Sequence, residues 1–123
     1  MALYLKRGEF VVPQWMAGDG AHAFSMRPIP AGEGLSGWVA QSRRAILNGN
    51  PTVEPNHLAG SGLFSPSSSA LSVPLFDADR SIVAVLTVYS SRPAAFSKEH
   101  LRILESVQSR VAGLPVLEEA LSL

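Results

Sequence analysis

The chain has 123 residues, of which 46% are hydrophobic, and its ten basic residues balance its ten acidic ones. These values predict one globular domain with its own core, and the absence of any block of like charge excludes an electrostatic surface for nucleic acid or an anionic membrane. The sequence contains no cysteine, which excludes disulfides, thiol catalysis and thiolate metal sites.

Two apolar runs begin the chain, at residues 2–5 and 10–17, and residues 6–9 (KRGE) join them. A charged turn that contains glycine, between two such runs, predicts a β-hairpin. The same charges interrupt the apolar stretch, so we expect no signal peptide. No later apolar run reaches the ~18 residues of a membrane span, and the expected location is the cytoplasm.

Residues 32–37 spell G-x-G-x-x-G, the pattern of a dinucleotide-binding turn. That site needs the glycines between a buried strand and a long helix, with an acidic residue about 20 residues further on. Glu54 has the spacing, but it lies between two prolines with no strand pattern around it. Pro28 and Pro30 argue against a central strand before the motif. We therefore interpret residues 35–42 as a short helix outside a dinucleotide site.

This short helix places Leu35 and Trp38 on one face. Trp38 is therefore expected either in the core or in the wall of a ligand pocket, and the same two interpretations apply to Trp15 and Tyr89 on the strands. Replacing Trp38 by alanine separates the two, because a core position would lose ~3–5 kcal/mol.

A short strand is expected at residues 45–48, and residues 49–69 then hold three prolines and three glycines, which predicts a long loop. Long loops in compact domains are usually functional or mobile. A brief helix around residues 57–60 is expected to interrupt this one. Phe64 is the expected lid residue, because a mobile apolar side chain over a pocket would close it.

A second hairpin is predicted from residues 70–76 and 81–90, with the turn at residues 77–80. Residues 82–89 are apolar on both faces, so this strand needs cover on both sides and should be central in the sheet. Pro74 cannot donate to a strand ladder and should therefore lie at a bulge or on an edge-facing position.

The last predicted element is an amphipathic helix that begins after Ser97, its expected N-cap residue. Phe96 and Leu101 have the spacing of a hydrophobic staple around that cap. One apolar stripe then follows the helix, formed by Leu101, Leu104, Val107, Val111 and Leu114. Its near-heptad rhythm, continued to Leu121, suits a dimer seam, although Pro115 interrupts it.

Five segments, in this order, resemble those of a GAF domain: residues 29–40 (IPAGEGLSGWVA), 44–51 (RAILNGNP), 69–75 (SALSVPL), 82–86 (IVAVL) and 96–101 (FSKEHL). Together they cover nearly the whole chain. Ala84 stands where the family usually has glycine. The family also normally begins with a helix beside the last helix, whereas this chain starts almost directly in its first strand. We therefore expect residues 1–123 to form a single GAF-like domain without that helix, whose bare apolar sheet face a partner chain would cover.

The resemblance implies an α/β (α+β) fold of the GAF/PAS-like type, with a central antiparallel sheet of about five to six strands and helices on both faces. The pocket of such domains lies over the face opposite the terminal helices. Members bind cyclic nucleotides, bilins, haem or small metabolites, and many dimerise and signal to an output domain through the last helix. These segments are most similar to the GAF domains attached to bacterial diguanylate cyclases, which implies such an output domain here.

The resemblance also narrows the ligand and the chemistry. Relatives attach bilins through cysteine, and the free-methionine-sulfoxide reductases of the family also need cysteines, which this chain lacks. The N-K-x-x-x-F-x-x-x-D-E signature of cyclic-nucleotide binding is also missing, so the cofactor or ligand stays unknown. His22, His57 and His100 do not have the clustered spacing of metal ligands, so no metal site is predicted.

We therefore expect a non-enzymatic domain that senses a small ligand and dimerises within a cytoplasmic signal-transduction protein, as a homodimer that regulates an output domain and binds neither nucleic acid nor membrane. The alternative is a ligand-free GAF-like dimerisation or interaction module. Sensing predicts a cavity lined by some of the aromatic residues, whereas the alternative predicts that they fill it. The candidate ligand-binding residues are Ser36, Trp38, Asn48, His57, Phe64, Ser69 and Tyr89.

Overall fold

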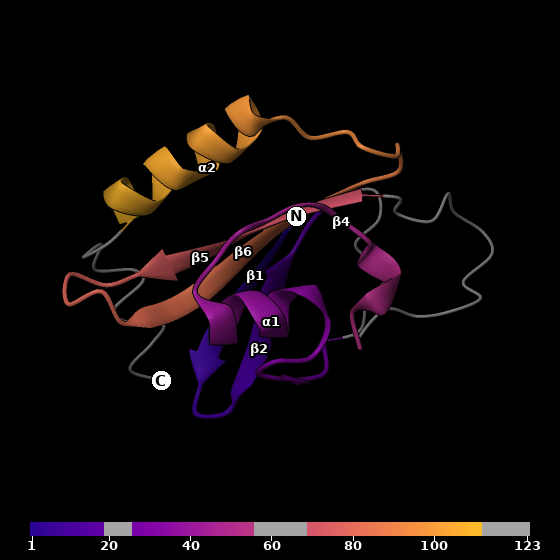
Figure 1. Ribbon diagram of the computed structural model, residues 1–123. Helices are drawn as coiled ribbons and strands as arrows, with labels where there is room; N and C mark the ends of the chain where they lie inside the picture. Colours follow the sequence, from indigo (N-terminus) through magenta and orange to yellow (C-terminus); the bar gives the residue numbers. More distant parts are fainter. Residues whose placement is uncertain (19–25, 56–68, 112–123) are drawn as a thin grey trace.

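The computed structural model describes residues 1–18, 26–55 and 69–111, with side chains up to residue 108. Its centre is a six-stranded sheet in the order β3-β2-β1-β6-β5-β4, and each pair of neighbouring strands is antiparallel. Helix α1 packs on one face of this sheet and helix α2 on the other (Figure 1). The predicted α/β fold with helices on both faces is confirmed.

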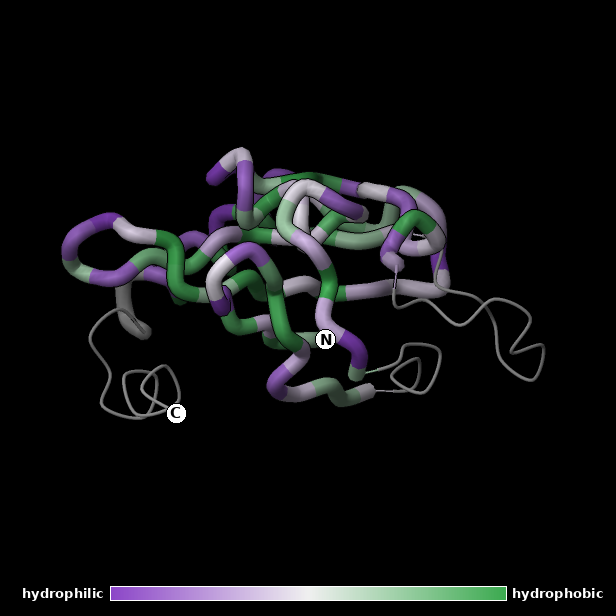
Figure 2. The backbone as a smooth tube through the Cα atoms, turned by 90° about the horizontal axis from the view of Figure 1, so that it is seen from below, coloured by the Kyte–Doolittle hydropathy of each residue, from purple (hydrophilic) through white to green (hydrophobic). Residues whose placement is uncertain are grey.

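In chain order the elements are β1 (Ala2–Arg7), β2 (Phe10–Met16), β3 (Ile29–Pro30), α1 (Gly34–Ser42), β4 (Ile46–Gly49), the single-turn 3-10 helix η2 (Pro51–Val53), β5 (Ser69–Phe76), β6 (Ile82–Ser90) and α2 (Lys98–Val111). Both predicted hairpins are present, as β1–β2 and β5–β6. The tips of the hairpins are hydrophilic, whereas the strands are largely hydrophobic (Figure 2).

An antiparallel sheet also excludes the dinucleotide-binding interpretation of the glycine motif, which needs parallel strands.

Strand β6 lies inside the sheet between β1 and β5, as its two apolar faces predict. Pro30 and Pro74 lie where the ladder is incomplete on one side. Strand β3, which contains Pro30, is a two-residue edge strand. Pro74 pairs with Val85 of β6, lies beyond Ser72, the last residue that pairs with β4, and is close to the register shift between Leu75 and Phe76.

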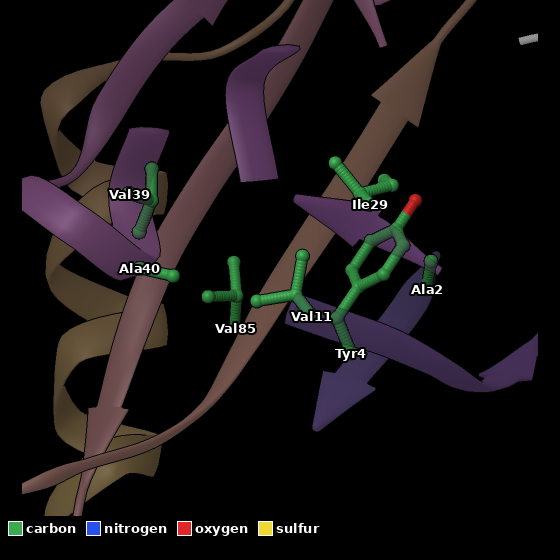
Figure 3. Packing of buried hydrophobic residues seen from close by; sticks show 7 residues of the cluster. All are labelled: Ala2, Tyr4, Val11, Ile29, Val39, Ala40 and Val85. Atoms are coloured by element: carbon green, nitrogen blue, oxygen red, sulfur yellow. The ribbon is translucent and has the colours of Figure 1, made fainter. Parts of the chain in front are cut away.

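Two separate cores lie on the two faces of the sheet. The core under α1 contains Ala2, Tyr4, Val11, Ile29, Val39, Ala40 and Val85 (Figure 3). The core under α2 contains Leu5, Leu71, Val73, Leu75 and Ala84. Because side chains alternate along a strand, β1 and β6 contribute to both. Ala84, at the position of the usual family glycine, is fully buried in the second core.

Helix α2 begins as predicted. The backbone N–H of His100 donates to Ser97 Oγ at 3.3 Å, and the backbone N–H of Ser97 donates to His100 Nδ1 at 3.0 Å, so the two residues cap each other. Phe96, Leu101 and Leu104 pack against the core under α2. Leu104, one residue of the expected dimer seam, packs in part against its own sheet. The stripe beyond residue 108 lies outside the described side chains.

Candidate functional site

The carboxylate of Glu54 meets the first turn of α1 inside the protein. Its Oε1 atom accepts hydrogen bonds from the backbone N–H groups of Leu35 at 2.5 Å and Ser36 at 3.0 Å. Its Oε2 atom accepts from the Ser36 hydroxyl at 2.6 Å. The Glu54 side chain is only 2% exposed, so this is a buried carboxylate held by the start of a helix.

The need for this contact follows from the geometry of α1. The first N–H groups of a helix have no partner within it. The N-cap residue of α1 is Glu33, whose side chain makes no capping hydrogen bond. Glu54, directly after η2, supplies the missing acceptors from 19 residues away in the sequence. Its negative charge is also favourable at the positive end of the helix dipole.

The glycine motif makes room for the carboxylate. Gly34 has φ +65°, which favours glycine, and a Cβ atom there would lie 2.6 Å from Glu54 Oε1 and 2.6 Å from Pro55 Cδ. The motif therefore does hold an anion at a helix N-terminus, but the anion is a side chain of the same protein. The acidic residue set aside with the dinucleotide interpretation is the one that binds there.

Two chains of hydroxyl groups converge on the same carboxylate. Tyr89 donates its phenolic hydrogen to Glu54 Oε2 at 3.0 Å, and the Tyr4 hydroxyl lies 2.8 Å from that of Tyr89. On the other side, the Thr87 hydroxyl lies 2.9 Å from Ser36 Oγ and 2.8 Å from Ser72 Oγ. We call these six residues the Glu54 network: Tyr4, Ser36, Glu54, Ser72, Thr87 and Tyr89.

The direction of each hydrogen bond in the network follows from the carboxylate. A hydroxyl has one hydrogen to donate. Because Tyr89 and Ser36 give theirs to Glu54, their second contacts must be as acceptors. Tyr4 therefore donates to Tyr89, Thr87 donates to Ser36, and Ser72 in turn donates to Thr87. A change at Glu54 would reverse or break both chains, which reach strands β1, β5 and β6.

The network is charged but contains no cation. Within the described residues, the partners of Glu54 are two backbone amides and two hydroxyl groups. Burial, and then the neighbouring charge of Glu54, raise the pKa of Tyr89 far above the ordinary 10.0 of a tyrosine. Tyr89 is therefore a fixed hydrogen-bond donor over the physiological pH range.

Only some of the predicted site residues come together. Ser36 and Tyr89 belong to the Glu54 network. The Asn48 amide instead bonds to the backbone of Phe96, donating to its carbonyl at 2.8 Å and accepting from its N–H at 2.9 Å. The Ser69 hydroxyl donates to the carbonyl of Arg92 at 2.6 Å. Asn48 and Ser69 thus fasten the sheet edge to the segment before α2.

Three other predictions have different outcomes. His57 and Phe64, and the brief helix at residues 57–60, lie outside the described residues. Trp38 is 40% exposed, and the buried residues of α1 are its neighbours Leu35, Ser36, Gly37, Val39 and Ala40, so the core interpretation of Trp38 is wrong. Trp15 is 48% exposed and is not a core residue either.

Four residues of the network were missed: Tyr4, Glu54, Ser72 and Thr87. Thr87 and Tyr89 lie two apart on β6, so they share a face of an otherwise apolar strand. That pattern was the available signal. For Glu54 the signal was its spacing from the glycine motif, but its partners are distant in the sequence and gave no pattern.

Other kinds of site find no support in the described parts of the chain. No group of three or more histidine, aspartate or glutamate side chains there could hold a metal ion. No described helix has the length and apolar character needed to cross a membrane.

The sequence profile of the GAF domain matches residues 2–113. No protein of curated function matches the chain. Among solved structures, it is similar to a proposed GAF sensor protein from Burkholderia vietnamiensis, with 27% identity, a TM-score of 0.68, and coverage of 88% of this chain and 65% of that one.

Two further structures share the fold. A type II free methionine-R-sulfoxide reductase from Thermoplasma acidophilum has 21% identity and a TM-score of 0.73, with 96% of this chain and 77% of that one covered. The GAF domain of a two-component sensor histidine kinase from Bacillus halodurans has 18% identity and a TM-score of 0.69, with 98% and 81% covered. The chain spans less than two thirds of some of these proteins, such as 65% of the Burkholderia protein. The chain belongs to the GAF domain family, a fold of sensory and regulatory domains.

Proposed function

We propose that this domain is a non-enzymatic sensor that binds a small ligand between the sheet and residues 49–69, and that it acts as a dimer in a cytoplasmic signalling protein. The observation that carries the proposal is the buried Glu54 carboxylate. It connects the end of η2 to the first turn of α1 and, through Tyr89, to the central strand β6. One charged group thus joins the loop side of the site to the sheet.

Such a connection can convert binding into a change of shape. A ligand that contacts Tyr89, which is partly exposed, would compete with Glu54 for the hydroxyl hydrogen or would stabilise the arrangement already present. Either effect gives the ligand different affinities for the two arrangements, which is what shifting an equilibrium requires. The altered packing of α1 on β6 and β5 would then reach α2 and the output domain. The resemblance of the segments makes a diguanylate cyclase the proposed output domain.

The proposal that the domain is not an enzyme rests on the same residues. Ser36 has a carboxylate partner, but it is fully buried, so its hydroxyl is not presented to a substrate. The reductases with this fold are named for reducing a sulfoxide, a reaction that consumes two electrons. The family relatives use cysteines for it, and this chain has none.

Dimerisation draws its support from the sheet face under α2. Leu3 packs on the core of that face, and its cross-strand partner on β2 is Trp15, which is 48% exposed. Residues directly opposite each other in an antiparallel pair share a face. A second copy that covers Trp15 would remove this apolar surface from water. Analytical ultracentrifugation of the wild type and of Trp15→Ser should show weaker dimerisation in the variant. Equal dimerisation of the two proteins would contradict a role of Trp15 in the dimer.

Native mass spectrometry beside the denatured mass tests the sensing function. Mass lost on denaturation identifies a retained small molecule, and we expect it in the wild type and in Ser81→Ala, whose serine is exposed. We expect it to be lost or reduced in Ser36→Ala. A bare dimer, with no added mass in any protein and none gained from a metabolite extract, would favour the ligand-free dimerisation module instead.

A further inference from the structure

We propose that the open groove at the C-terminal end of α1 is a second ligand site, and that it binds a small organic anion with one negative charge and an apolar body. It lies away from the Glu54 network. Glu54 meets the first turn of α1, whereas the groove is lined by Ala40, Gln41 and Arg43 at the other end of the helix. This inference does not depend on the proposed function.

The groove has the size of a small-molecule site. Its volume is about 550 Å³, within the usual range of roughly 300–1,000 Å³ for ligand pockets. Three parts of the fold line it: the β1–β2 hairpin, the end of β3 with the next residue, and the end of α1 with the start of β6. All of its lining residues are described: Lys6, Gly8, Glu9, Phe10, Pro30, Ala31, Ala40, Gln41, Arg43 and Ile82.

Arg43 is held in a defined position. It is the C-cap residue of α1, with φ 65°, and its guanidinium carbon lies 4.9 Å from the ring centre of Phe76. One of its terminal nitrogens donates to the carbonyl oxygen of Arg80. A guanidinium has five N–H donors, so this arrangement orients Arg43 and leaves donors for a ligand.

The charges around the groove favour an anion. Lys6 and Arg43 both line it, and their hydrogen bonds within the described residues are to backbone carbonyl oxygens, those of Gly8 and Arg80. Glu9 is the single acidic residue in the lining. Two cations against one carboxylate attract one negative charge, and Glu9 would repel a second.

The apolar part of the ligand follows from the other residues. Phe10 is 45% exposed, which is unusual for a phenylalanine on a strand, and Ile82 and Pro30 lie in the same lining. A ligand whose apolar body covers Phe10 would bury this surface while its oxyanion reaches Lys6 or Arg43. Small-molecule sites typically combine such an apolar lining with a few polar groups.

The test uses 1-anilinonaphthalene-8-sulfonate, a monoanion with an apolar body, and its uncharged analogue N-phenyl-1-naphthylamine. Each is titrated into the whole ¹⁵N-labelled chain, and the amide shifts are followed by NMR. We expect the sulfonate to shift the amides of Gly8, Ala31 and Gln41 but not those of Leu35 and Ser36. The uncharged analogue should bind the groove more weakly, by about two- to fivefold for each exposed charge pair that is lost.

Variants show which cation of the groove binds the sulfonate. Arg43→Asn keeps a residue that tolerates positive φ, and it should weaken sulfonate binding about fivefold. Arg44→Asn, an equal change of charge at the exposed next residue, should leave binding unchanged. Lys6→Gln provides a second variant should the loss of the Phe76 contact unfold the first.

Three results would overturn the proposal: shifts confined to Leu35 and Ser36, equal binding of the uncharged analogue, or affinities unaffected by Arg43→Asn or Lys6→Gln. The first would place the anion at the Glu54 end of α1, and the other two concern only the groove at the remote end. Failure here therefore leaves the proposed sensing site untouched, and failure of that site leaves this one untouched.

Discussion

The two faces of the central sheet are built from the same strands but differ in chemistry. The face under α2 buries the apolar side chains of Leu5, Leu71, Val73, Leu75 and Ala84. The face under α1 also has an apolar cluster, but it adds the Glu54 network. Buried polar groups stabilise a protein only when all their hydrogen bonds are made. We therefore infer that the α2 face contributes to stability through apolar burial, whereas the stability of the α1 face also depends on the hydrogen bonds of the Glu54 network.

The largest effect is expected on the apolar face. Leu71 is 1% exposed, and Leu71→Ala should lower the free energy of unfolding by about 2–5 kcal/mol through loss of apolar contacts and the cavity left behind. Chemical denaturation measures this. Each folded molecule of the variant should still carry as much bound small molecule as the wild type does. Loss of ligand from a fully folded variant would show that the two faces are not functionally distinct.

Next in size is the effect of removing the carboxylate. Glu54→Ala leaves the N–H groups of Leu35 and Ser36 buried without acceptors, so we expect a loss of about 2–4 kcal/mol. Glu54→Gln keeps one oxygen at the helix start and should lose less. If both variants are as stable as the wild type, the network does not hold α1.

A smaller change tests the fit between the glycine motif and the carboxylate. Gly34→Ala places a Cβ 2.6 Å from Glu54 Oε1, and together with its φ of +65° this should cost about 1–3 kcal/mol. Gly8→Ala is the matched control, because Gly8 has φ +59° with nothing within 4 Å of the added Cβ. The difference between the two should shrink in a Glu54→Ala background. An unchanged difference would place the clash elsewhere.

The smallest effect concerns a single hydroxyl. Tyr89→Phe should cost about 1–2 kcal/mol, more than Tyr4→Phe, because only Tyr89 donates directly to Glu54. The raised pKa of Tyr89 also sets a pH dependence. Its stabilising effect is complete below the ordinary tyrosine pKa of 10.0 and is lost as the pH rises above it. Above pH 10.0 the free energy of unfolding should therefore fall more steeply with rising pH in the wild type than in Tyr89→Phe.

The fold was largely predictable because its signals are local. Alternating apolar runs gave both hairpins, the two-sided strand β6 gave the centre of the sheet, and Ser97 with Phe96 gave the start of α2. The core interpretation of Trp38 was wrong, because a nine-residue helix leaves the direction of its buried face uncertain by one position. Neighbouring residues of a helix point in quite different directions.

The site was less predictable because it depends on contacts between distant segments. The network forms only when η2 brings Glu54 to α1 and the β5–β6 pairing sets Ser72 beside Thr87. Neither of these two contacts produces a periodic pattern in the sequence. The glycine motif did indicate an anion at a helix start, but the identity of that anion is a matter of tertiary structure.

Hydrogen exchange of the Leu35 and Ser36 amides tests the central claim most directly, namely that Glu54 joins the loop side of the site to α1. We predict slow exchange of both amides in the wild type. In Glu54→Gln they should exchange at least about tenfold faster. The exchange rate of the Leu71 amide serves as the reference, because it should change only with the global stability of the protein. Equal exchange at Leu35 and Ser36 in the two proteins, after correction by Leu71, would contradict the account.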